Sequence, residues 1–167
     1  SINLSNSSTM MAKIIKSTSF RNGVRYVMTK TDARLIAAKE VYYANFKTIA
    51  ESFNAKAELN PRLRKNVGHI SLNFSAQDKD KVDDALMRTV AREYMQKIGI
   101  VDTPYIIVRH YDREHPHCHI IFSRIDNNGN TISDKNDRLR SGKACRADTE
   151  KYGVRLKLTD SKQDGQR

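Results

Sequence analysis

Residues 105–123, YIIVRHYDREHPHCHIIFS, consist of two apolar segments that flank six polar residues. The segments at 105–110 and 117–123 are rich in β-branched and aromatic residues, which favour extended strands. Pro104 stands at the start of the first strand, where its missing N–H disrupts no ladder hydrogen bond. The polar stretch at 111–116 is typical of a turn, so we predict that the two segments pair as an antiparallel hairpin.

Four of the chain's five histidines lie in this hairpin, between residues 110 and 119. Side chains two apart on a strand share a face, so His117 and His119 point one way while Cys118 points into the predicted core. His110 ends the neighbouring strand beside them. Three imidazoles on one face can hold a divalent cation with open coordination positions, which predicts a metal site. The alternative is that they are exposed polar residues on a half-solvated sheet.

Other polar residues are candidate partners for these histidines. Asp112 and Glu114 could accept a hydrogen bond from a ligand histidine and so orient its ring. His115, next to Pro116, is expected to be solvated. His69 falls on the polar side of a predicted strand. It either orders the metal site or approaches a phosphate group bound there, or it is a hydrogen-bonded structural histidine.

The N-terminal part of the chain is predicted to form a short strand and two helices. Residues 12–16 are a strand candidate, and Ser19 can cap a helix that runs to about residue 28 and carries Tyr26. A longer helix is predicted from about 40 to 57, because residues near one face recur at helical spacing.

The middle of the chain shows both periodicities of regular structure. Residues 69–74, HISLNF, alternate between polar and apolar, as in a strand with one buried face. Ser75 and Asp78 resemble a capping pair for the next helix, in which apolar residues recur every four positions from Val82 until Gly99 ends it.

The C-terminal third is predicted to contain a turn, a short strand and a last helix. Asn-Asn-Gly at 127–129 indicates the turn, 131–133 the strand and 137–152 a basic helix that stops at Gly153. The order of strand, helix, strand, helix and hairpin predicts an α+β fold, with a central, largely antiparallel sheet flanked by helices.

Composition limits the class of protein. The chain has 167 residues, 38% of them apolar, which suits one folded domain. Its net charge of +11 favours nucleic acid as the partner, with a solvated basic surface as the alternative. No apolar run approaches the roughly 20 residues that span a bilayer, and the two cysteines suit a reducing compartment, so we expect a cytoplasmic protein. Residues 1–10 are expected to be disordered leader residues or residues added for expression, and 158–167 a frayed tail.

Taken together, these features resemble the relaxase/mobilization nuclease family of conjugative and mobilizable elements, especially MobP-like relaxases of Bacteroides-type gut anaerobes. The resemblance runs from Met11 to about Leu156. Three segments carry it: AKIIKSTSFRNGVRYVMTK (12–30), NPRLRKNVGHISLNFSAQDK (60–79) and HYDREHPHCHIIFSRIDNNGNTISDKNDR (110–138). The third segment contains an HxDxxxxHxH pattern that leads into a strand, and it is the most specific of the three.

The resemblance implies the HUH endonuclease architecture and a relaxase that nicks one DNA strand at an origin of transfer. Tyr26 would be the nucleophile, forming a 5′-phosphotyrosine intermediate before the strand is rejoined. His110, His117 and His119 would hold one divalent metal ion, Mn or Mg foremost, with Zn, Ni or Co also compatible. Single-stranded DNA, accessory mobilization proteins and a coupling protein would be the partners. The catalytic domain would span 11–157, and family members often continue into a longer C-terminal region.

Several assignments stay open from the residues alone. The chain has seven tyrosines, and the adjacent Tyr42 and Tyr43 are rivals of Tyr26. Basic residues near the tyrosine, before His69 and in the last helix are candidate contacts to the DNA backbone, although any one of them could be a solvated surface charge: Arg21, Arg25, Lys30, Arg62, Arg64, Lys65, Arg138 and Arg140. Two other functions remain, a three-histidine metallohydrolase that activates water and a non-catalytic basic DNA-binding module.

Overall fold

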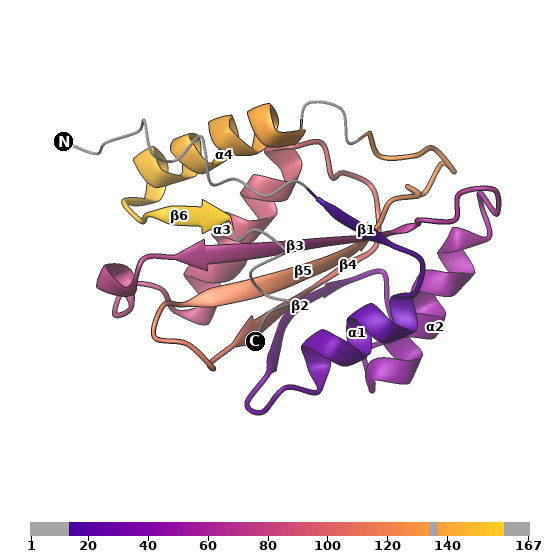
Figure 1. The fold of residues 1–167 in the computed structure, drawn as a ribbon, viewed down its shortest axis with the longest axis horizontal. Coiled ribbons are helices and arrows are strands. Elements are labelled where there is room, and N and C mark those ends of the chain that lie inside the picture. The colour runs from indigo at the N-terminus through magenta and orange to yellow at the C-terminus, as the bar shows by residue number, and fades with distance from the viewer. Residues whose placement is uncertain (1–13, 134–136, 159–167) are drawn as a thin grey trace.

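The computed structural model describes residues 14–133 and 137–158. Within them six strands form one antiparallel sheet in the order β1-β3-β5-β4-β2, and β6 also pairs with β3 (Figure 1). The strands are β1 (Ile15–Ser17), β2 (Arg34–Lys39), β3 (Val67–Phe74), β4 (Tyr105–His110), β5 (His117–Ser123) and β6 (Leu156–Leu158). The helices are α1 (Phe20–Met28), α2 (Phe46–Ala57), α3 (Asp84–Lys97) and α4 (Asp137–Tyr152), with a short 3-10 helix, η2 (Ala76–Asp78).

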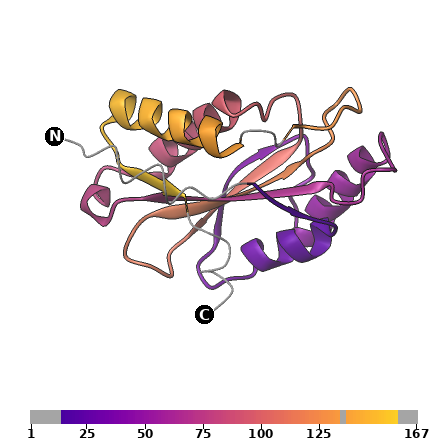
Figure 2. The same cartoon turned by 45° about the horizontal axis from the view of Figure 1, so that its top comes forward.

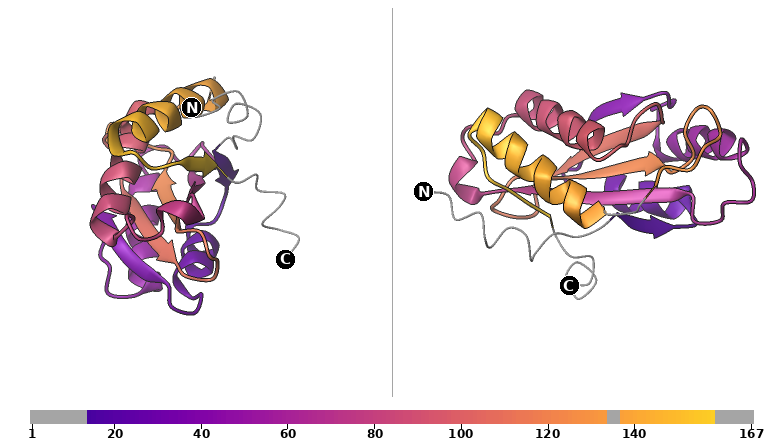
Figure 3. Two further views of the ribbon diagram at one scale, coloured as in Figure 1. Left: turned by 90° about the vertical axis from the view of Figure 1, so that its left-hand side faces the viewer. Right: turned by 90° about the horizontal axis from the view of Figure 1, so that it is seen from above.

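Helices cover both faces of the sheet. α1 and α2 lie against one face and α3 and α4 against the other, as Figure 2 shows with the sheet seen nearly edge-on. In Figure 3, α3 and α4 lie side by side on their face. Alternate residues of the central strands feed two apolar cores, Cys118 and Phe122 on the α3 side and Ile121 on the α1 side. The predicted α+β class with a helix-flanked antiparallel sheet is therefore confirmed.

The predicted hairpin forms the middle of this sheet. β4 and β5 pair antiparallel, with His110 opposite His117. The other edge of β5 pairs with β3, which places Ser71 opposite His119. β5 is therefore a central strand, with its backbone hydrogen-bonded to β3 on one side and to β4 on the other. This pairing fixes the positions from which its histidine side chains project.

A cap and an apolar stripe determine α1, as the sequence predicts. The Ser19 side chain accepts a hydrogen bond from the backbone N–H of Asn22 at the start of the helix. The helix buries Phe20, Val24 and Val27. The remaining face is exposed and carries Tyr26, so packing of α1 determines where the tyrosine lies.

Two predicted helix starts are wrong because other residues cap the helices. α2 begins at Phe46 rather than near residue 40, because the Asn45 side chain accepts hydrogen bonds from the backbone N–H groups of Lys47 and Thr48. α3 is capped by Asp83, whereas Ser75 caps only the short η2.

The strands at the sheet edges also differ from the prediction. The sequence pattern indicated neither β2, which pairs with β4, nor β6, which pairs with β3. The strand predicted at 131–133 is wrong, because Thr131 forms only an isolated bridge with Ile125. The strand predicted at 12–16 overlaps β1 in its last two residues.

The last helix matches its prediction, and Gly153, with φ of 67°, ends it in the left-handed conformation that glycine adopts freely. The predicted leader at 1–10 and all of the predicted tail at 158–167 except Leu158, which belongs to β6, lie outside the described residues. Within the described part, no helix is long and apolar enough to cross a membrane. Cys118 and Cys145 are buried free thiols.

Candidate active site

One face of the β4–β5 hairpin brings three buried histidines together. His110, His117 and His119 each offer a ring nitrogen, and these nitrogens all lie within 4.8 Å of one another. The residues are 1%, 3% and 4% exposed, respectively, so the interpretation of exposed polar residues on a solvated sheet is wrong. This spacing is compatible with one metal ion held by the three rings together.

His110 has one ring nitrogen fixed and the other without a partner. Its Nε2 lies 2.7 Å from the backbone carbonyl oxygen of Val27 in α1; a carbonyl only accepts, so Nε2 carries the proton. Its Nδ1 is buried and has no hydrogen-bond partner among the described residues. A buried lone pair without a partner costs free energy unless something binds it. A divalent cation would bind this lone pair. The Nδ1 atom without a partner is therefore the observation that supports a metal ion at the cluster.

His119 is oriented by side chains of β3. Its Nδ1 lies 2.8 Å from Nε2 of His69 and 3.2 Å from Oγ of Ser71. With Nδ1 engaged there, Nε2 is the nitrogen that can face a metal. His69 thus lies beside the cluster, and its role there stays a prediction.

His117 is held from the turn that joins β4 to β5. Its Nε2 lies 3.0 Å from Oδ1 of Asp112, and its Nδ1 lies 3.3 Å from the carbonyl oxygen of His115. Oδ2 of Asp112 accepts a hydrogen bond from Nζ of Lys30 at 3.1 Å. Burial alone would raise the pKa of Asp112, but Lys30 and His117 bring it below the ordinary value. Asp112 and Glu114 are both exposed, and Asp112 contacts His117 of the cluster. That either residue orients a ligand histidine stays a prediction.

Burial keeps the three imidazoles neutral. It lowers the pKa of His117 to about 4, with partial compensation from the hydrogen bond to His115 and the charge of Asp112. Burial likewise lowers the pKa of His110. The pKa of His119 lies well below the ordinary value, because burial and then the charges of neighbouring imidazoles disfavour its protonated form. Neutral imidazole is the form that binds metal, so the cluster is in its binding state at neutral pH.

Tyr26 lies at the accessible side of the cluster. Its ring centroid is 6.2 Å from that of His119 and 6.4 Å from that of His69, edge-on in both pairs, and the residue is 44% exposed. The phenol opens to a small pocket that it shares with side chains of the sheet and the turn, namely Lys30, Ser71, Asn73, Arg113, His117 and His119. The phenol and two of the three clustered histidines, His117 and His119, therefore line the same pocket.

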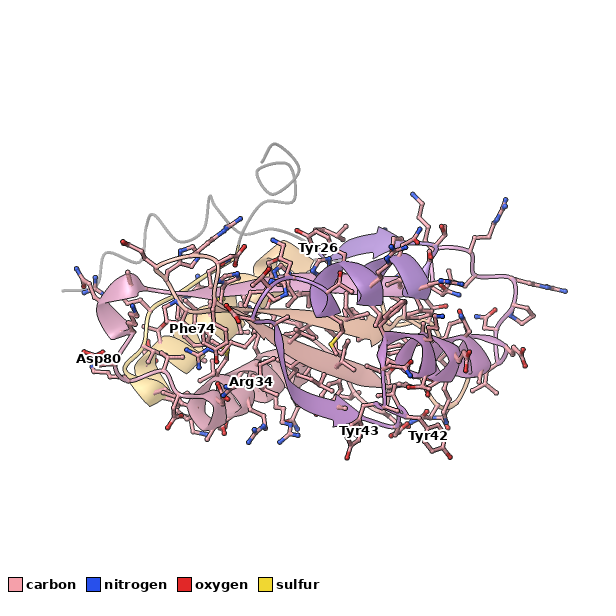
Figure 4. The ribbon with its side chains drawn as sticks, turned by 90° about the horizontal axis from the view of Figure 1, so that it is seen from below. Tyr26, Arg34, Tyr42, Tyr43, Phe74 and Asp80 are labelled. Carbon is pink, nitrogen blue, oxygen red and sulfur yellow. The ribbon has the colours of Figure 1, made fainter. Side chains whose placement is uncertain are left out.

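The rival tyrosines lie elsewhere. Tyr42 and Tyr43 follow β2, are 81% and 66% exposed, and lie together at a distance from Tyr26 in Figure 4. All seven tyrosines belong to the described residues, and Tyr26 is the one that lines the pocket beside the histidines. Geometry therefore favours Tyr26 over its rivals.

The sequence prediction missed several features of this pocket. Ser71 and Asn73 line the pocket, and their only signal in the sequence was their place on the polar face of β3. Arg113 also lines it, but it belongs to a turn, where charged side chains are usually solvated. His115 is half-buried with Nε2 3.1 Å from Oδ1 of Asn73, so the expectation of a solvated residue is wrong. Cys118 is confirmed as a core residue, because it is buried on the opposite face and burial raises its pKa to about 12.

The predicted DNA contacts fall into three groups. Residues Arg21 and Arg25 are exposed on α1, and Arg62, Arg64 and Lys65 are exposed in the segment before β3. Lys30 differs from these because it forms an ion pair with Asp112. The side chains of Arg138 and Arg140 in α4 lie outside the described part of the chain. Contact of any of them with DNA stays a prediction.

The fold and the pocket together define an α+β domain with a buried histidine site that can hold a metal and with a tyrosine at its opening. Residues 26–154 match the family of MobA/VirD2-like relaxase nuclease domains, and the chain belongs to this family. The match begins at Tyr26 and includes all three histidines. Membership makes the chain a DNA endonuclease of the relaxase type, which nicks DNA that it binds as a single strand. No curated protein matches the chain.

Proposed function

We propose that the chain nicks one DNA strand at an origin of transfer, with Tyr26 as the nucleophile, and later rejoins the strand during conjugative mobilization. One observation carries this proposal: the Tyr26 ring lies 6.2 Å from that of His119, and both line the same pocket. A phosphate within reach of the phenolic oxygen is then also within reach of a cation held by the histidine cluster.

The reaction exchanges one phosphoester bond for another. The phenolic oxygen of Tyr26 attacks phosphorus, the new P–O bond forms, and the bond to the 3′ oxygen breaks. The products are a 5′-phosphotyrosine and a 3′-hydroxyl, which takes up a proton equivalent to the one the phenol loses, so no water is consumed. The 3′-hydroxyl can attack the phosphotyrosine and restore the strand. A water nucleophile would destroy this link, so a tyrosine suits strand transfer.

The surrounding side chains orient the metal-binding rings. His110, His117 and His119 would hold one divalent cation, which would supply positive charge next to the phosphate and so make phosphorus more open to attack. The Val27 carbonyl fixes the ring of His110, and His69 orients His119. Because Val27 belongs to α1, the helix that carries Tyr26 is tied directly to one ligand histidine.

The ion and the partners follow from the same chemistry. Imidazole nitrogens bind Mn, Zn, Ni and Co alike, and a phosphate substrate adds oxygen ligands that suit Mn and Mg. We therefore propose Mn²⁺ or Mg²⁺ as the catalytic ion. Single-stranded DNA would reach the pocket along the basic residues of α1 and of the segment before β3. Accessory mobilization proteins and a coupling protein would act with the chain in the cytoplasm.

Replacement of Tyr26 by Phe should abolish a covalent DNA adduct, because it removes the attacking oxygen and keeps the ring. The whole chain is incubated with Mn²⁺ and with single-stranded oligonucleotides that tile the DNA on both sides of its gene, alongside a randomised pool. Denaturing gels detect the adduct, and mass spectrometry maps the nucleotide to one tyrosine. Tyr42→Phe is the matched control and should keep the adduct.

Three outcomes contradict the proposal. Free turnover that survives in Tyr26→Phe indicates a metallohydrolase that activates water. Salt-dependent binding without cleavage, with Mn²⁺, Mg²⁺, Zn²⁺, Ni²⁺ or Co²⁺, indicates a binding module. An adduct that maps to another tyrosine removes Tyr26 from its role.

A further inference from the structure

Lys30 lies two residues beyond the end of α1 and beside the phenol of Tyr26. Its Nζ is 5.3 Å from the centre of the Tyr26 ring and 3.1 Å from Oδ2 of Asp112. Its side chain is 34% exposed and lines the same pocket as Tyr26, His117 and His119. A single ammonium group is thus placed between the nucleophile and the turn that contacts the histidine cluster.

This ammonium group is charged and fixed. Burial by itself would lower the pKa of Lys30, but the hydrogen bond to Asp112 and the attraction of the Tyr26 phenol raise it above the ordinary value. Asp112 is held in turn, because its other oxygen lies 3.0 Å from Nε2 of His117. Lys30 therefore carries its proton at neutral pH.

A lysine that only contacts the DNA backbone would not need the ion pair with Asp112. Arg21 and Arg25 are exposed on the same helix and can follow a flexible strand of DNA. Anchoring a lysine by an ion pair costs side-chain entropy and contributes little stability when the pair is partly exposed. A charge fixed in advance does, however, stabilise negative charge that develops at a defined atom in a transition state.

We propose, on the basis of the function proposed above, that Lys30 is a catalytic residue whose ammonium stabilises negative charge on the phenolic oxygen of Tyr26 in both directions of the reaction. In nicking, the Tyr26 oxygen carries this charge as its bond to phosphorus forms and the bond to the 3′ oxygen breaks. In rejoining, the charge returns to the phenolic oxygen as the P–O bond to Tyr26 breaks and the 3′ oxygen bonds to phosphorus. Lys30 keeps its proton throughout, and solvent takes the phenolic proton and returns one to the leaving oxygen.

The proposal is tested by separating chemistry from binding in Lys30→Met and Lys30→Arg. The oligonucleotide tile that forms the adduct with the wild-type chain is used at saturating concentration with Mn²⁺, and single-turnover adduct formation is timed. DNA affinity is measured by fluorescence anisotropy over a salt series in a Tyr26→Phe background. Lys47→Met is the matched control, because Lys47 is exposed on α2 and does not line the pocket.

We expect the rate constant of Lys30→Met to fall about 100-fold, as when one preorganised charge or donor is removed from other enzymes. DNA affinity and its salt dependence should match those of Lys47→Met, whose rate should equal that of the wild type. Lys30→Arg keeps the positive charge on a side chain of different shape, so its rate constant should lie between those of the wild type and Lys30→Met. Site-specific 3,5-difluorotyrosine at position 26 should partly rescue Lys30→Met, because a less basic phenolic oxygen needs less stabilisation.

Several results overturn the proposal. An unchanged rate in Lys30→Met does so, and so does a change confined to affinity with a salt slope smaller by roughly 0.7, which is the signature of one lost phosphate contact to a single strand. Weaker Mn²⁺ binding by Lys30→Met in calorimetry would mean that the residue acts through Asp112 and His117. If the wild-type chain forms no adduct, or Tyr26→Phe keeps it, the function proposed above fails as well, which distinguishes that failure from a failure at Lys30 alone.

Discussion

At the scale of single residues, the site is built by giving each histidine a different partner. His110 donates to a backbone carbonyl, His119 shares a hydrogen bond with His69, and His117 faces Asp112. Three kinds of partner hold the three rings, and one nitrogen of each ring lies within 4.8 Å of those of the other two. The cost of this arrangement is that three imidazoles are buried in neutral form.

That cost should make the metal-free protein sensitive to acid. The folded pKa of His117 is about 4, below the value of about 6.5 in an unfolded chain. The unfolded state therefore binds more protons between these values. The contribution of the neutral histidine to the free energy of unfolding is therefore complete above about pH 6.5. It is lost as the pH falls toward 4, by up to about 1.4 kcal/mol per pH unit for each such histidine. Urea denaturation in the presence of a chelator, at a series of pH values, measures this slope.

The carboxylates do not obscure this effect. Asp84 and Asp112 have pKa values below the ordinary range, so their contributions are lost only at more acid pH than the upper part of the histidine window. His117→Gln is the matched variant, because it keeps a polar side chain that does not titrate. A slope equal to that of the wild type in this variant, or a stability independent of pH above 5, would contradict the assignment of buried neutral imidazoles.

Part of this residue-level picture could be predicted from the sequence. Spacing of two along a strand placed His117 and His119 on one face, and the hairpin placed His110 beside them. The ion pair of Lys30 with Asp112 joins residues 82 positions apart, and it depends on how the end of α1 meets a turn. No local pattern carries such information, because side-chain pairs of this kind depend on tertiary packing.

At the scale of elements, α1 links the tyrosine to the metal site. The helix is nine residues long and begins at a single side-chain cap, Ser19. It carries both Tyr26 and the Val27 carbonyl that accepts from His110. Fraying of this short helix would therefore move the nucleophile and loosen a ligand histidine together.

We expect Ser19→Ala to lower the free energy of unfolding by about 1 kcal/mol, since the N–H of Asn22 loses its acceptor. The same change should slow adduct formation at saturating DNA. Asn45→Ala removes the cap of α2 and serves as the control, with a similar loss of stability in urea and a smaller loss of rate. Equal rates in the two variants would mean that the order of α1 does not limit the chemistry.

Elements with long, regular patterns could be predicted, and elements at edges could not. The hairpin follows from its two β-branched segments, α1 from the Ser19 cap and its apolar stripe, and the end of α4 from Gly153. β2 reads RLIAAK, where alanines weaken the strand preference, and β4 supplies the missing stability by pairing along it. β6 has three residues, too few for a periodicity, and is a strand because the edge of β3 offers it hydrogen bonds. Ser75 and Asp83 are both good caps, and the sequence alone does not rank them.

At the scale of the whole molecule, function depends on where the charge of +11 lies. The sheet separates two helical layers (Figure 2), and Tyr26 of α1 lines the pocket. Exposed basic residues on that side and at the start of β3 can neutralise the backbone of a strand that enters the pocket. Exposed lysines at the other end of β3 and on α3 contribute to the same net charge from a different place.

Two triple variants with equal net charge separate location from total charge. One changes Arg62, Arg64 and Lys65 to Gln, and the other changes Lys79, Lys81 and Lys97, so each carries 11 − 3 = +8. In anisotropy measurements, the slope of log affinity against log salt should fall by about 2 in the first variant, at roughly 0.7 per phosphate for single strands, and stay near the wild-type value in the second. Adduct formation at saturating DNA should be unchanged in both, because neither set touches the pocket. Equal slopes in the two variants would mean that the strand responds to net charge alone and that the segment before β3 is not its path.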